Sequence, residues 1–132
     1  MRKRNMFFAT VAILLVCSCV AVAASNSWST TLPAARVRRD VATGRKSSFT
    51  DYVRSSLNTM GGEYTQVRAR VWSATDSRWA TGQVILDKGS GLRKMSFSDS
   101  SNYVNSNLTL SVSNNIITTV EVDASGIFEY SP

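Results

Sequence analysis

Histidine and cysteine, which carry most nucleophilic and metal chemistry in proteins, are almost missing from this sequence of 132 residues. The chain has no histidine, and both of its cysteines, Cys17 and Cys19, lie in the N-terminal segment. Ser-His-Asp triads, Cys-His pairs and the usual zinc sites all need one of these side chains. We also find no phosphate-binding loop and no dinucleotide fingerprint. We therefore expect no catalytic residue, no metal site and no cofactor.

Two kinds of catalytic pair are still compatible with the composition. A Ser-Lys dyad needs a lysine that is removed from water. Beyond the N-terminal segment the lysines are Lys46, Lys88 and Lys94. Paired carboxylates support glycoside hydrolysis, and Glu121, Asp123 and Glu129 lie close together in the sequence. Because charged side chains normally occupy the exposed face of a strand, we predict that the protein is not an enzyme.

Aromatic and arginine side chains alternate with small apolar ones over residues 64–72. If the apolar residues face a core, those between them face outward, and Trp79 extends the row across a hairpin. The candidate binding residues are Tyr64, Arg68, Arg70, Trp72 and Trp79. Aromatic rings beside guanidinium groups bind glycans, peptides or nucleic acids by stacking. Alternatively, the tryptophans fold over the end of the core and the arginines are simply solvated.

Strands must position these side chains, because residues 64–130 have a sustained period-two pattern. Turn residues separate the apolar segments at short intervals. Six segments are expected to be strands: 64–72, 79–87, 92–97, 103–113, 116–123 and 127–130. No helix long enough for a parallel crossover lies between them. We predict an all-β fold, a small antiparallel β-sandwich, in a domain that spans residues 48–132.

Two structures are compatible with residues 48–60. Ser48 and Asp51 resemble a helix capping box, and Gly61-Gly62 is a good helix stop. The segment is also rich in residues that favour strands, and thirteen residues make a marginal helix. We favour an edge strand or an irregular start to the domain, with the helix as the alternative.

The N-terminal segment has the parts of an export signal. Arg2-Lys3-Arg4 is a basic start, an apolar run follows, and small residues end at Ala24. These features predict a signal peptide over residues 1–24 and a secreted mature protein without disulfides. One alternative is an uncleaved membrane anchor, because the segment is nearly long enough to cross a bilayer. Another is tethering by lipidation at Cys19 in a degenerate lipoprotein box.

Residues 25–47 have little periodicity and many small polar residues, which predicts a flexible, disordered basic linker. Its basic residues are Arg36, Arg38, Arg39, Arg45 and Lys46. Such a stripe either attracts an anionic cell envelope weakly or is merely solvated. Residues 36–39 also match a furin-type processing site, so cleavage after Arg39 stays open. Without the three basic residues at the start, the net charge falls from +6 to +3, and we expect no nucleic-acid partner.

The export signal, the basic segment, the Val-Arg-Ala-Arg-Val strand at 67–71 and the ending Val-Asp-Ala-Ser-Gly-Ile-Phe at 122–128 resemble small, uncharacterised secreted proteins of Gram-positive bacteria. These proteins have no established activity, so the resemblance implies secretion but no site residue. We expect a non-enzymatic module that binds a cell-surface glycan, peptide or protein. The alternative is a bacteriocin-like effector that acts on neighbouring cells, in which residues 25–46 are removable without loss of the fold.

Overall fold

The computed structural model describes residues 23–132, so nearly all of the predicted signal peptide, including Cys19, lies outside the described residues. Every regular element in this part of the chain is a β-strand, and none of its residues forms a helix that could cross a membrane. The strands are β1 (Ala24–Leu32), β2 (Arg39–Arg45), β3 (Tyr52–Met60), β4 (Gln66–Ser73), β5 (Arg78–Trp79), β6 (Val84–Asp87), β7 (Arg93–Ser96), β8 (Asn107–Asn114) and β9 (Val122–Ser131). The all-β prediction is confirmed, but the expected count of about six strands is too low.

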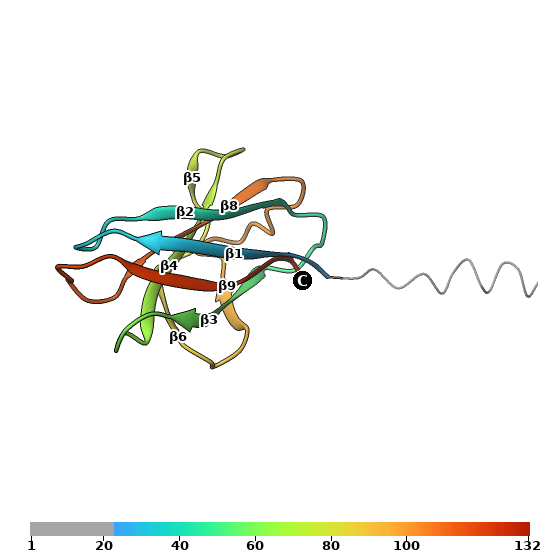
Figure 1. Ribbon diagram of the computed structural model, residues 1–132. Coiled ribbons are helices and arrows are strands. Elements are labelled where there is room, and N and C mark those ends of the chain that lie inside the picture. Colours follow the sequence, from blue (N-terminus) through green and yellow to red (C-terminus); the bar gives the residue numbers. More distant parts are fainter. Residues whose placement is uncertain (1–22) are drawn as a thin grey trace, which may run out of the picture.

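Two antiparallel sheets make up the fold. One has the order β1-β9-β3-β7, and the other has the order β2-β8-β4-β5, with β6 also paired to β4. Ala24 lies opposite Ser131, so the C-terminus lies beside the start of β1 (Figure 1). Residues of both sheets form one buried hydrophobic cluster. Burial of this apolar surface is the main favourable term for the fold.

Strand β4 shows how the sequence pattern produces this core. Buried and half-buried positions alternate along its eight residues. Val67, Ala69 and Val71 have no exposed surface, whereas Arg68 and Arg70 between them are half-buried on the other face. The alternation predicted for residues 67–71 is therefore correct, because one face of the sheet lies against the core and the other meets solvent.

The prediction of a flexible linker over residues 25–47 is wrong. β1 pairs with β9 and β2 pairs with β8, so the segment supplies one strand to each sheet. Trp28 and Leu32 are buried in the core, while most other side chains of β1 and β2 are exposed or half-buried. Backbone pairing holds such strands without an apolar pattern. Residues 25–46 therefore cannot be removed without taking a strand from each sheet.

Within residues 48–60 the structure has a strand, β3, over residues 52–60, and no helix. β3 pairs with β9 on one side and with β7 on the other, so it lies inside its sheet and not at the edge that we predicted. The domain accordingly begins at β1 and not at residue 48. The predicted strand 79–87 is also divided, because β5 and β6 pair separately with β4 around the buried Ala80 and Thr81.

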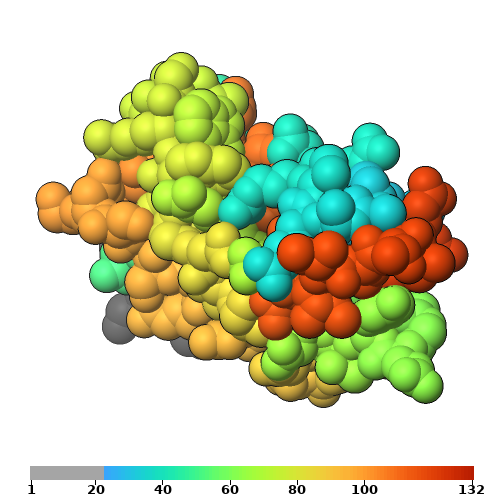
Figure 2. All heavy atoms as spheres, turned by 90° about the vertical axis from the view of Figure 1, so that its left-hand side faces the viewer, coloured from blue at the N-terminus to red at the C-terminus, as the bar shows by residue number. Residues whose placement is uncertain are grey.

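The predicted strand at 116–123 is mostly a loop. Ile117 and Val120 are 73% and 53% exposed, and β9 starts only at Val122. This loop lies beside the connection between β1 and β2 (Figure 2), and the Ala35 amide donates to the Thr118 carbonyl at 2.8 Å. β9 then continues through Gly126, where we expected a break. A Cβ at Gly126 would overlap the Ser56 carbonyl, so only glycine allows this close approach of β9 to β3.

Candidate functional site

A pair of tryptophans lies on the outer face of the five-stranded sheet. Trp72 in β4 is the pairing partner of Trp79 in β5 and, on its other side, of Thr109 in β8. The two indole rings meet edge to face, with 5.2 Å between centroids and 80° between planes. Both are half-buried, so part of each ring stays open to solvent. Half-exposed aromatic rings of this kind are frequent contact points for ligands.

Two guanidinium groups contact the same indole. The Cζ atom of Arg70 lies 4.6 Å from the Trp79 ring centroid, and that of Arg38 lies 5.1 Å from it. Both distances are within the range of a cation–π interaction. The side chain of Arg38 comes from the connection that precedes β2, far from Arg70 in the sequence. The fold therefore brings a third segment of the chain to the tryptophan pair.

Only neutral groups accept hydrogen bonds from these arginines. Arg70 Nε donates to the Thr81 carbonyl at 3.0 Å, and Arg38 Nη2 donates to Gln83 Oε1 at 3.1 Å. Nearby, Arg68 Nε donates to an amide oxygen, Asn115 Oδ1, at 3.2 Å. The ion pairs among residues 23–132 involve other arginines. The positive charges of this cluster, Arg38, Arg68 and Arg70, therefore have no internal carboxylate partner.

The environment of Arg38 reflects this excess of positive charge. Burial lowers the pKa of Arg38 below its ordinary value, and the charges of Arg70 and Arg68 lower the same pKa further. The Nη1 atom of Arg38 is buried and has no hydrogen-bond partner. A buried donor without a partner is costly, and native proteins leave few of them. Because this nitrogen is itself buried, what the cluster offers to a ligand is the positive charge that no carboxylate among the described residues neutralises.

An open groove of about 360 Å³ lies on this face of the five-stranded sheet. Its lining consists of Arg38, Asp40, Trp72, Trp79, Thr109 and Ser111. Asp40 stands opposite Ser111 in the β2–β8 pairing, and Ser111 stands opposite Arg70 in the β8–β4 pairing. The groove therefore combines aromatic surface, one guanidinium group, a threonine hydroxyl and one carboxylate, and Arg70 and Arg68 lie beside it on the same face of the sheet.

Two of the five predicted binding residues, Trp72 and Trp79, line the groove. Arg70 contacts Trp79 beside it, and Arg68 lies on the same face of β4. Tyr64 does not join them. It precedes β4, packs against the core and lines a different hollow with Glu121 and Asp123. Sequence reasoning missed Arg38, because it lay in the expected linker and no local pattern relates it to Trp79.

The basic residues predicted to attract an envelope are not all on the surface. Lys46 has no exposed surface, although Arg36, Arg39 and Arg45 are exposed. The Nζ atom of Lys46 donates to the carbonyls of Ser48 and Thr50, both at 2.6 Å. Lys46 therefore belongs to the interior and cannot contribute to a surface stripe.

Lys46 also lies near a hydroxyl, as a Ser-Lys dyad requires. Its Nζ atom is 3.2 Å from Ser48 Oγ, and burial lowers the pKa of Lys46. However, the two main-chain carbonyls stabilise the ammonium form, which opposes its use as a base. None of the principal hollows among the described residues includes Ser48. The arrangement fits a structural role, in which the ammonium group fixes the connection between β2 and β3.

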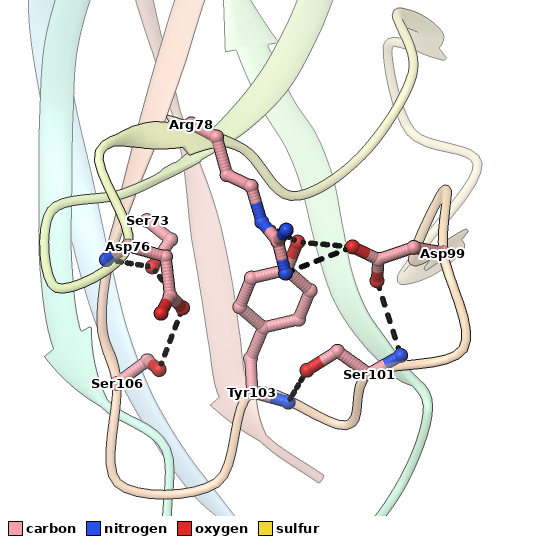
Figure 3. Close-up of polar contacts among 7 residues, drawn as sticks. All are labelled: Ser73, Asp76, Arg78, Asp99, Ser101, Tyr103 and Ser106. Atoms are coloured by element: carbon pink, nitrogen blue, oxygen red, sulfur yellow. Dashed lines mark hydrogen bonds and ion pairs between the residues drawn. The ribbon is translucent and has the colours of Figure 1, made fainter.

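Another arginine, Arg78, lies over the Tyr103 ring at the β4–β5 turn (Figure 3). Arg78 Nη2 is 3.0 Å from Asp99 Oδ2, and Arg78 Nε donates to the Tyr103 hydroxyl at 3.0 Å. The same hydroxyl donates to Asp99 Oδ2 at 3.0 Å. Nearby, Asp76 Oδ2 accepts from Ser73 and Ser106. These groups satisfy one another, so the cluster ties loop 99–106 to the β4–β5 turn.

Acidic residues do not gather into a site in the described part of the chain. No three His, Cys, Asp or Glu side chains among residues 23–132 are placed to hold a metal ion. Glu121 and Asp123 are exposed, and Glu129 Oε1 lies 3.7 Å from Arg54 Nε. The three carboxylates considered for hydrolysis thus include one that is engaged in an ion pair.

No family model matches the chain, and no curated protein matches it. Among solved structures, AlgX from Pseudomonas aeruginosa is similar, with a TM-score of 0.45 and 12% sequence identity. The similarity covers 84% of this chain and 27% of the AlgX chain, so the present chain spans about a quarter of that protein. A similarity at this level carries no argument about function, which must come from the residues of the groove.

Proposed function

We propose that this chain is an exported, non-enzymatic β-sandwich module that binds a glycan in the groove on its five-stranded sheet. The observation that supports this function best is the stacking of Arg38 and Arg70 on Trp79, beside Trp72, around an open groove. An indole ring offers a flat apolar surface to the C–H face of a sugar ring. Thr109 lines the same groove and is half-buried, and its hydroxyl suits a hydroxyl of a sugar.

A peptide fits this position less well. Extended peptides commonly add a strand to a free sheet edge. The groove instead lies on the face of the sheet, over side chains of β2, β8, β4 and β5, and not along the main chain of one free edge. A glycan needs no backbone pairing and binds across side chains, so the position of the groove on the sheet face favours it.

The bacteriocin-like alternative has no observation in its favour. The basic segment that such an effector would use for its activity pairs with β8 and β9 and is part of both sheets. Export itself rests on the basic start, apolar run and small residues of the N-terminal segment. The Gram-positive origin rests only on the sequence resemblance.

Substitution of the tryptophans tests the binding function. Electrophoresis through gels that contain neutral and acidic polysaccharides should show retardation of the wild-type protein. Trp79→Ala and Trp72→Ala should weaken it about tenfold, because stacking contributes on the order of 1–2 kcal/mol. Phe49→Ala is the matched control, since Phe49 is 78% exposed and is absent from the groove. The proposal fails if no polysaccharide retards the protein, or if folded tryptophan variants migrate as the wild type does.

A further inference from the structure

The sheet face around the groove carries three arginines without an ion pair among the described residues: Arg38 lines the groove, and Arg68 and Arg70 lie beside it. Arg38, Arg68 and Arg70 donate only to neutral acceptors, and none forms an ion pair among the described residues. Arg38 Nη1 is buried without any partner. Bringing like charges together on one face is unfavourable unless something compensates for it. The missing component is therefore an acceptor that carries negative charge.

We infer that the carboxylate of an acidic glycan chain binds to Arg38, which lines the groove, and to Arg70, which lies beside it against the same Trp79 ring. The solvent-exposed parts of Trp72 and Trp79 support the sugar ring. This inference rests on the proposed function and names its ligand class. A guanidinium group matches a carboxylate in shape and donates two parallel hydrogen bonds to it. Because Arg38 and Arg70 both contact Trp79, a carboxylate attached to a stacked sugar lies within their reach.

The carboxylate of Asp40 affects which anionic ligands the groove accepts. It lines the groove but lies beyond ion-pair distance of the arginines. As an acceptor it suits a sugar hydroxyl, whereas it repels a second carboxylate placed next to it. The combination favours a chain that presents hydroxyl groups beside each carboxylate over polyglutamate or an anionic lipid surface, which offer Asp40 no such hydroxyl.

Calorimetry with matched ligands tests the inference on the full chain. A hexamer of galacturonate is compared with its fully methyl-esterified form, which keeps the sugar backbone and removes the charge. We expect the acid to bind at least about tenfold more tightly than the ester. Arg38→Ala, Arg38→Gln and Arg70→Ala should each weaken the acid about tenfold and leave the ester unchanged, in line with a charged hydrogen bond. Arg78→Ala is the control, because Arg78 also stacks on a ring but lies outside the groove.

Each other outcome overturns the inference in a distinct way. Equal binding of acid and ester, weakened by Trp79→Ala, would leave the glycan module in place and remove the carboxylate. Hexaglutamate or phosphatidylglycerol vesicles that bind as tightly as the acid, with the same loss in the arginine variants, would show an anion site that is not specific for glycans. Failure of the folded protein to bind either glycan form, or any polysaccharide of the gel panel, would overturn the proposed function as well.

Discussion

Arg78 and Arg38 both lie over an aromatic ring, yet they occupy opposite electrostatic environments. The guanidinium carbon of Arg78 is 5.3 Å from the Tyr103 centroid, and that of Arg38 is 5.1 Å from the Trp79 centroid. A hydrogen bond with Tyr103 and the charge of Asp99 raise the pKa of Arg78. Burial and two neighbouring arginines lower the pKa of Arg38.

The difference shows that an arginine stacked on an aromatic ring does not by itself indicate a binding site. At the β4–β5 turn the carboxylate is supplied by the protein, so the cluster of Arg78, Asp99 and Tyr103 is complete (Figure 3). At the groove the carboxylate of Asp40 lies beyond ion-pair distance of Arg38, and one buried nitrogen of Arg38 has no partner among the described residues. We interpret the complete cluster as structural and the incomplete one as the ligand site.

The largest effect is expected for Tyr103→Ala, which should lower the stability of the fold and leave ligand binding unchanged. Tyr103 is 2% exposed, packs against Phe97 with 4.7 Å between ring centroids, and joins Arg78 to Asp99. Tyr103→Ala should lower the free energy of unfolding by about 3–5 kcal/mol, as for other buried aromatic residues. Urea denaturation measures this loss. The affinity of the remaining folded protein for the galacturonate hexamer should not change, and a binding loss without a stability loss would reverse the two assignments.

A carboxylate introduced next to the arginines of the groove should pair with them, as Asp99 pairs with Arg78. Thr109 lines the groove beside Trp72, so Thr109→Glu places an acid near Arg38 and Arg70. We expect a loss of at least about tenfold in affinity for the acidic hexamer, because the new carboxylate competes for the guanidinium groups. Calorimetry measures the loss. Ser29→Glu makes the same charge change on the exposed side of β1 and should leave the affinity within about twofold; equal losses would indicate only a net-charge effect.

The Arg78 cluster should make stability depend on pH through the hydroxyl of Tyr103. Burial is the main factor that raises the pKa of Tyr103, and the hydrogen bond to Asp99 adds to it. Above about pH 10 the tyrosine of the unfolded chain loses its proton before that of the folded chain, so stability falls as the pH rises through this range. Between about pH 9 and about pH 11 the wild type should lose more stability than Tyr103→Phe does. Identical slopes in urea denaturation would show that the hydroxyl has the same pKa in both states.

The smallest effect should come from the exposed ion pair. Asp99→Asn removes the charge that faces Arg78 but keeps a side chain of similar shape. Because such pairs contribute little in water, the melting temperature should fall by only about one or two degrees. Differential scanning calorimetry measures the change, with Asp51→Asn as a control on an exposed acid that forms no ion pair among residues 23–132. A fall as large as that of Tyr103→Ala would mean that the charge, and not the packing, holds this loop.

The sequence predicted the strands whose two faces differ in polarity. In β4 the alternation of Val67, Ala69 and Val71 with polar residues follows directly from burial on one side. β1 and β2 carry no such signal, since their pairing depends on main-chain groups that every sequence shares. Gly126 was misleading because glycine marks a turn in most contexts, whereas here it allows close contact between strands.

The candidate site was predictable only within one stretch of chain. Arg70 and Trp72 share a strand face, and Trp79 follows at hairpin distance, so period-two reasoning grouped them correctly. Tyr64 shares their parity but precedes the strand, where the alternation no longer fixes its direction. Arg38 lies near Trp79 because β2, β8 and β4 pair side by side, although these segments are far apart in the sequence. That no carboxylate pairs with Arg38 depends on all the residues of this sheet face, so no local sequence pattern predicts it.

The most direct test of the central claim is NMR observation of arginine side chains during titration with the galacturonate hexamer. Nε–H signals report each guanidinium group separately, and the indole N–H signals report the two tryptophans. We predict that the signals of Arg38, Arg70 and Trp79 shift together and saturate, while that of Arg78 stays in place. A shift at Arg78, or saturation of binding without any shift at Arg38 and Arg70, would contradict the assignment of the unpaired arginines as the ligand site.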